Sequence, residues 1–107
     1  MVHDFSKPLD LGRTFELITC IEVVEHLLEE DALVLLDTIT NMASKYIYFS
    51  SDAYTIESAE EPTHINMQEE KYWVEQFEKR GFVKYEYFPA CRSVPHAILF
   101  LNKEILK

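Results

Sequence analysis

The spacing of apolar and polar residues changes period along the chain, and each period predicts an element. Phe15 to Ile21, "FELITCI", is apolar apart from Glu16 and Thr19, the pattern of a parallel strand that is covered on both faces. From Glu29 to Ser44 the apolar residues recur at helical spacing, and acidic residues stand at the positive N-terminal end, which predicts a helix. The aromatic and β-branched residues of "YIYFS", 46–50, predict a second strand.

The second half of the chain begins with a long segment without a clear period, Ser51 to Ile65. A loop of that length in a small domain is usually functional or disordered. Asn66 followed by Glu69 has the form of a capping box, which predicts a helix that runs to Arg80 and stops at Gly81. The buried stripe expected for this helix is Trp73, Val74 and Phe77.

Two further strands are predicted at the end of the chain. Residues 82–88 alternate in polarity as a half-exposed strand does, and 96–101, "HAILFL", are apolar enough for a central strand. Residues 89–95 would join the two as a loose hairpin. The resulting order is strand, helix, strand, loop, helix, strand, strand, which predicts one α/β domain over 1–107 whose sheet begins parallel and ends in an antiparallel pair.

Composition narrows the possible functions. The net charge of −9 argues against a protein that binds duplex nucleic acid, which needs a basic face for the phosphates. No apolar run approaches the roughly 20 residues of a membrane span. The start of the chain lacks a signal peptide, so a cytoplasmic location is expected. Cys20 and Cys91 are interpreted as buried or incidental thiols. Since the chain has only two glycines, it has no glycine-rich loop of its own for phosphates.

One polar cluster stands out at the exit of the first strand, in "IEVVEHL". If these residues form a helix or a tight turn, the i, i+3, i+4 spacing places Glu22, Glu25 and His26 on one side. Three readings stay open for them: ligands of a divalent cation, a general base at His26, or a structural pair at a helix start.

Several of these segments together resemble one family, the class I S-adenosylmethionine-dependent methyltransferases, in their C-terminal half. The likeness rests on "FELITCIEVVEH" as the fourth strand of that family and its exit, on a helix that ends in Gly-Phe, and on the final hairpin. It implies a partial Rossmann-like methyltransferase fold. It also implies that Asp4 lies near the adenine of S-adenosylmethionine and that Cys20, Ile21 and Glu22 lie near its methionine end.

The resemblance extends to a possible metal site. The ubiquinone-biosynthesis and small-RNA methyltransferases carry a similar E-x-x-E-H segment, and the latter add a distal histidine that helps to bind a divalent metal. His64 matches that histidine here, so the resemblance implies Glu22, Glu25, His26 and His64 as catalytic residues and as ligands of an ion such as Mg²⁺. The expected acceptor of the methyl group is an oxygen or nitrogen of a small molecule.

The family's glycine-rich cofactor loop has no counterpart in these residues, so we expect a truncated domain that is inactive alone. Its first strand would then be an apolar sheet edge without guarding charges, which favours a homodimer or a partner that covers the edge. The alternative function is a non-catalytic module for dimerisation or regulation.

Overall fold

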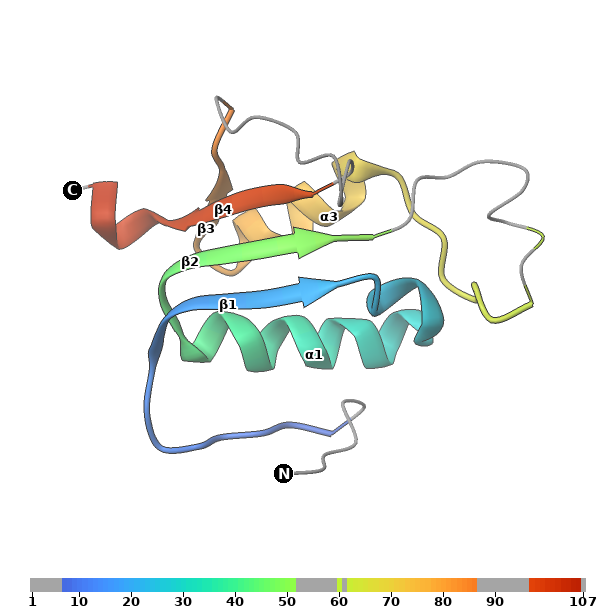
Figure 1. Ribbon diagram of the computed structural model, residues 1–107, viewed down its shortest axis with the longest axis horizontal. Helices are drawn as coiled ribbons and strands as arrows, with labels where there is room; N and C mark the ends of the chain where they lie inside the picture. The colour runs from blue at the N-terminus through green and yellow to red at the C-terminus, as the bar shows by residue number, and fades with distance from the viewer. Residues whose placement is uncertain (1–6, 52–59, 61, 87–96, 107) are drawn as a thin grey trace.

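The computed structural model describes residues 7–51, 60, 62–86 and 97–106, which form a four-stranded sheet with two long helices (Figure 1). Asp4, Cys91 and His96 lie outside the described residues, as does the hairpin expected at 89–95. In chain order the elements are β1 (Phe15–Ile21), the 3₁₀ turn η1 (Val24–His26), α1 (Glu29–Met42), β2 (Ala43–Ser50), α3 (Glu70–Lys79), β3 (Phe82–Lys84), β4 (Ile98–Asn102) and the 3₁₀ turn η2 (Lys103–Leu106).

The sheet has the order β1-β2-β4-β3. β1 and β2 pair in parallel through α1, whereas β4 runs antiparallel to both β2 and β3. This confirms the predicted α/β sheet that starts parallel and ends antiparallel. It also confirms that β1 is an edge strand of the described sheet.

The predicted boundary between α1 and β2 was wrong by two residues. Ala43 and Ser44 belong to β2 rather than to the helix, because Ala43 pairs with Phe15 and the Ser44 hydroxyl donates to the Phe15 carbonyl. Pairing with β1 therefore overrides the helical period that both residues continue.

The predicted start of α3 was also wrong. The helix begins at Glu70 and has no side-chain cap, while Asn66 bonds elsewhere. Its end was predicted correctly, since Gly81 follows with φ +86°, a left-handed conformation that favours glycine. β3 covers only residues 82–84 of the longer strand that was expected.

Both helices pack on one face of the sheet, and the hydrophobic core lies between them and the strands. Phe49 of β2 contacts the rings of Trp73, Phe77 and Phe100, and Phe77 stacks on Phe100 at 4.1 Å between ring centroids. In Figure 1, α1 runs alongside β1 and α3 lies behind β2 and β4. The core thus joins all of the long elements.

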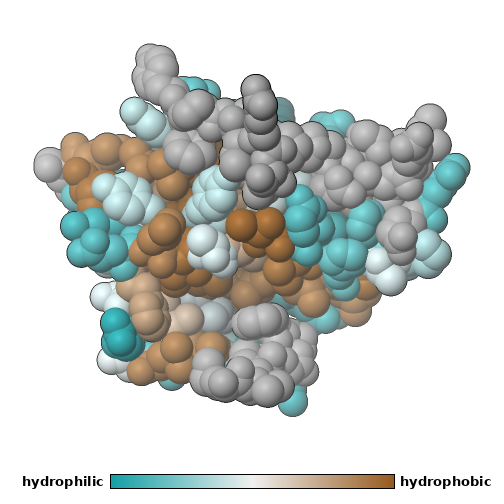
Figure 2. All heavy atoms as spheres, viewed as in Figure 1, coloured by the Kyte–Doolittle hydropathy of each residue, from teal (hydrophilic) through white to brown (hydrophobic). Residues whose placement is uncertain are grey.

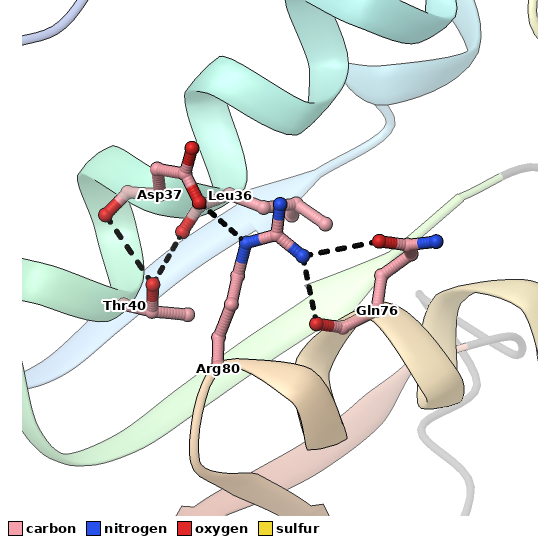
Figure 3. A network of polar contacts seen from close by, with 5 residues as sticks. All are labelled: Leu36, Asp37, Thr40, Gln76 and Arg80. Atoms are coloured by element: carbon pink, nitrogen blue, oxygen red, sulfur yellow. Dashed lines mark hydrogen bonds and ion pairs between the residues drawn. The ribbon is translucent and has the colours of Figure 1, made fainter.

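A polar network joins the two helices at the edge of this core (Figure 3). The Arg80 guanidinium donates through Nε to Asp37 Oδ1 of α1 at 2.7 Å. Its Nη1 donates to the carbonyl and to the side-chain oxygen of Gln76 in α3. The arginine therefore fixes the end of α3 against the middle of α1.

No described helix packs on the opposite face of the sheet. Paired residues of neighbouring strands point to the same face, so Leu17, Tyr46, Leu101 and Val83 form one row across it. Figure 2 shows apolar residues gathered over the strands in this view. The expectation that β1 is covered on both faces was therefore wrong for the described residues, because Leu17 is 53% exposed.

Candidate functional site

The candidate site lies at the carboxyl ends of β1 and β2. Directly after β1, Glu22 adopts φ +55°, a left-handed conformation that is uncommon for a residue with a side chain. Its backbone N–H donates to the Ser50 carbonyl, and its carboxylate accepts from the Ser50 hydroxyl at 3.0 Å. The end of β2 thereby holds the strained turn in place, and the chain enters η1 from there.

Glu25 is the buried acid of the site, with 1% of its surface exposed. Oε2 accepts from the Ser51 hydroxyl at 3.4 Å, whereas Oε1 has no hydrogen-bond partner among the described groups. Burial, and then the Glu22 carboxylate beside it, raise the pKa of Glu25 from 4.5 to about 7. Two ionised carboxylates have no proton to share, so their contact becomes a hydrogen bond only when one of them is protonated.

His26 is held by a backbone group from a distant segment. Its Nδ1 lies 3.0 Å from the Thr63 carbonyl oxygen, which can only accept, so Nδ1 carries the hydrogen. In the neutral ring Nε2 therefore has the lone pair, and it lies 3.8 Å from Glu25 Oε1. The histidine side chain is 41% exposed, so Nε2 combines contact with a buried acid and access from solvent.

His64 completes what we term the carboxyl-end cluster: Glu25, His26 and His64. The two imidazole rings meet edge to face at 4.8 Å between centroids. One ligand atom from each of the three residues lies within 4.8 Å of the others. The fourth residue proposed from sequence, Glu22, is not part of this group, because its carboxylate is turned to Ser50 and to Glu25.

The sequence did not single out Ser50, Ser51 or Thr63, and it assigned Asn66 to a helix cap. Asn66 is instead 4% exposed and donates to the backbone of η1. The two serines had a usable signal, since polar residues that directly follow an apolar parallel strand stand where α/β folds place ligands. Thr63 acts through its carbonyl group, which no side-chain pattern reveals.

Two of the residues expected near the methionine end of the cofactor, Cys20 and Ile21, differ in their exposure to solvent. The Cys20 side chain points into the core, and burial raises the pKa of its thiol to about 12. Ile21 is 38% exposed at the sheet edge. Asp4, expected at the adenine, lies outside the described residues.

An apolar pocket of about 220 Å³ opens beside this end of β1, on the helix side of the sheet. Ile18, Cys20 and Ile21 of β1 form one wall, and Leu35 and Ile39 of α1 form another. Its lining suits an apolar group rather than a charged one. No helix in the described part of the chain is long and apolar enough to span a bilayer.

Comparisons with known proteins identify the fold. No protein-family model matches the chain, and no curated protein matches it by sequence. Among solved structures, it is similar to the magnesium protoporphyrin IX methyltransferase ChlM from Synechocystis PCC 6803 with bound SAH. That match has a TM-score of 0.65 and 15% identity, and it covers 94% of this chain and 48% of ChlM.

The chain is also similar to LepI in complex with SAM, with a TM-score of 0.65 and 16% identity, over 95% of this chain and 29% of LepI. A third match, with a TM-score of 0.63, 14% identity and the same two shares, is described as a pericyclic reaction enzyme. The chain therefore has part of the fold of S-adenosylmethionine-dependent methyltransferases and spans less than half the length of these proteins. The likeness shows the fold, and the third match shows that this fold also serves other chemistry.

Proposed function

We propose that these residues are the C-terminal half of an S-adenosylmethionine-dependent methyltransferase that acts on an oxygen or nitrogen of a small molecule. One observation carries the proposal: on a methyltransferase fold, the carboxyl-end cluster gathers at the edge where α/β proteins bind ligands. The backbone strain at Glu22 and the unpartnered oxygen of buried Glu25 lie at the same edge. Strain and unsatisfied buried groups concentrate at functional sites.

The position of each residue at the site suggests its role in the proposed reaction. When bound, S-adenosylmethionine would supply the methyl group from its positively charged sulfur, and Ile21 and Glu22 at the end of β1 would hold its methionine end. His26 would accept the proton of an acceptor hydroxyl at Nε2, which carries the lone pair in the Nδ1–H tautomer, and the hydroxyl oxygen could then take the methyl group as the sulfur–methyl bond breaks. At a pH above its pKa of about 7, the ionised Glu25 carboxylate, 3.8 Å from Nε2, would stabilise the imidazolium that forms. Most of the remaining rate enhancement comes from positioning.

The same cluster fits a divalent cation, as an alternative to the general base, because the single lone pair of His26 Nε2 cannot bind both a proton and an ion. Glu25 Oε1 is buried and has no hydrogen-bond partner among the described residues, and the His26 tautomer leaves Nε2 available as a ligand atom. Ligands of one ion stand roughly 3 Å apart, so atoms now within 4.8 Å must move closer by 1–2 Å. We propose Glu25, His26 and His64 as the ligands of an ion such as Mg²⁺ or Mn²⁺, with Glu22 beside them. Such an ion would lower the pKa of an acceptor hydroxyl.

Thermal melting separates the cation from a purely structural cluster. We expect Mn²⁺ at millimolar concentration to raise the melting temperature of the wild-type chain. The Glu25→Gln variant should lose this response, because the amide is a weaker ligand than a carboxylate. Glu78→Gln, at an exposed position of α3, is the matched control. Equal melting of the wild type with Mn²⁺ and with a chelator would eliminate the cation.

A partner at the β1 edge belongs to this proposal. The unpaired edge, the apolar row that starts at Leu17 and the 220 Å³ pocket all meet at β1. A second copy related by a two-fold axis can pair with the edge or cover the face, but one such contact does not do both. We propose that a partner covers this edge, either a second copy of the chain or a partner with a strand beside β1 and a helix over Leu17. For the isolated chain, a second copy is the available partner.

Calorimetry with S-adenosylhomocysteine tests the function. A complete site with a Kd of about 1 μM corresponds to about −8 kcal/mol, and half of that energy corresponds to a Kd of about 1 mM. We therefore expect weak binding by the wild type and further weakening by Ile21→Asp. The matched control is Ile105→Asp, on the exposed turn η2. Absence of heat at roughly 10 mM would favour the non-catalytic module instead.

A further inference from the structure

Two segments that are far apart in the sequence carry the cluster, and Asn66 joins them. Glu25 and His26 lie on η1, and His64 lies on the segment 62–66. The Asn66 backbone N–H donates to the Glu25 carbonyl at 3.1 Å, and its side-chain Nδ2 donates to the Val24 carbonyl at 3.3 Å. Asn66 is buried, with 4% of its surface exposed. Asn66 therefore satisfies two successive carbonyl groups of the turn.

The orientation of the Asn66 amide follows from a third contact. Gln68 Nε2 donates to Asn66 Oδ1 at 2.9 Å and also to Glu29 Oε2 at 3.1 Å. Because Oδ1 accepts from Gln68, the Asn66 group that faces the Val24 carbonyl is Nδ2, a donor. A flipped amide would place two acceptors together at the Val24 carbonyl and two donors together at Gln68 Nε2. The assignment of Nδ2 as donor and Oδ1 as acceptor in Asn66 therefore agrees with both of its side-chain hydrogen bonds.

His64 lies between two residues whose hydrogen bonds join the segment 62–66 to η1. On one side of it the Thr63 carbonyl accepts from His26 Nδ1, and on the other side Asn66 donates to η1. Displacement of Asn66 would therefore release the Thr63 carbonyl as well, and with it the bond that sets the tautomer of His26. Which ring nitrogen of a histidine can bind a ligand depends on the bond that the other nitrogen makes.

We propose that Asn66 is a positioning residue of the carboxyl-end cluster: it places His64 beside His26 and maintains the Nδ1–H tautomer of His26. It does not itself contact the acceptor or an ion. The positioning role of Asn66 rests on the proposed function only in one respect, namely that the cluster serves catalysis or binds an ion. The tautomer and the contact between the two rings are properties of the chain itself and can be measured without ligand.

If Asn66 had only a structural role, its substitution would have a different consequence. A buried amide that only satisfies two carbonyl groups would, when removed, lower the stability of the fold without changing the ring of His26. Thr38→Val provides a control for that outcome. Thr38 is also buried and accepts a bond from the Leu9 N–H, but it lies on α1, away from the cluster.

The test is ¹⁵N NMR of the histidine side chains in chelator-treated full chain at pH 8. We expect His26 of the wild type and of Thr38→Val to show the Nδ1–H tautomer and an NOE to the His64 ring. Asn66→Ala and Asn66→Asp should show mixed tautomers and lose the NOE, because neither side chain can donate to the Val24 carbonyl. Gln68→Ala is a milder change, which removes the donor to Asn66 Oδ1 and to the exposed Glu29 carboxylate but keeps the Asn66 bonds to η1. It should give an intermediate result if the Asn66 variants do not fold.

Titration with Mn²⁺ adds a second readout. If the cluster binds the ion, Asn66→Asp should weaken the affinity at least tenfold, the usual effect of losing a residue that orients ligands, whereas Thr38→Val should not change it. No Mn²⁺ binding by the wild type, together with altered tautomers in the Asn66 variants, would contradict the cation but support the positioning role. An unchanged His26 tautomer and NOE in the Asn66 variants, or an Nε2–H tautomer in the wild type, would overturn the proposal.

Discussion

Glu25 is the residue whose chemistry departs most from that of a surface acid. Its carboxyl group is neutral in the folded chain up to pH values near its pKa of about 7, while the unfolded chain ionises it near 4.5. The folded state therefore binds more protons between these values. The stabilisation that this difference provides is complete below pH 4.5 and is lost as the pH rises through 7.

The pH dependence of stability tests this shift. We expect the free energy of unfolding of Glu25→Gln, relative to the wild type, to rise by about 3 kcal/mol between pH 5 and pH 9, because glutamine has no proton to lose. Urea denaturation of both chains in the presence of a chelator measures it. Parallel pH profiles of the two chains would show that Glu25 titrates normally.

Cys20 should be unreactive in the folded chain. A pKa raised to about 12 by burial leaves almost no thiolate at pH 8, and the thiolate is the reactive form. In a Cys91→Ser background, where Cys20 is the remaining thiol, we expect a disulfide reagent to label under about 10% of the native chains and all chains in denaturant. Fast native labelling would mean that β1 opens.

Residue types indicated part of the site but not its internal geometry. The sequence named Glu25, His26 and His64, and the structure brings them together. It grouped Glu22 with them on the assumption of a continuous turn, and the left-handed backbone at Glu22 breaks that turn. Asn66 read as a cap because capping is a local property, whereas its actual partners are about 40 residues away.

At the scale of elements, the spacing of apolar residues predicted the bounds of helices and strands correctly where interactions between neighbours in sequence determine them. The bounds of β1 and the stop at Gly81 were correct. The start of α3 and the end of α1 were wrong where contacts with distant segments compete with helical spacing. The exposed face of β1 was also missed, because an apolar strand looks the same whether or not a neighbouring layer covers it.

The contact between the helices leads to a prediction at this scale. Arg80→Ala removes the bonds to Asp37 and Gln76, and we expect the free energy of unfolding to fall by about 1–2 kcal/mol. Lys71→Ala removes only an exposed ion pair with Glu75 within α3, and we expect a loss of about 0.4 kcal/mol or less. Equal losses from the two variants in urea denaturation would show that the Arg80 network does not join the helices.

The whole molecule presents one side of its sheet without a described layer of helices. An apolar edge and face of this kind promote association, and no charged residue guards the second half of β1. We expect light scattering to show a dimer of the isolated chain at micromolar concentration. Leu17→Lys should shift it to a monomer, while Leu106→Lys, at an exposed apolar residue of η2, should not. A monomeric wild type at about 100 μM would contradict the proposed interface.

The proposed function requires the chain to bind S-adenosylhomocysteine at the carboxyl end of β1. The most direct measurement is a map of backbone amide shifts during titration with S-adenosylhomocysteine to about 10 mM. We expect shifts centred on residues 20–27 and 62–66, which should be smaller in Ile21→Asp and unchanged in Ile105→Asp. Shifts confined to other surfaces, or none at all, would contradict the proposed function.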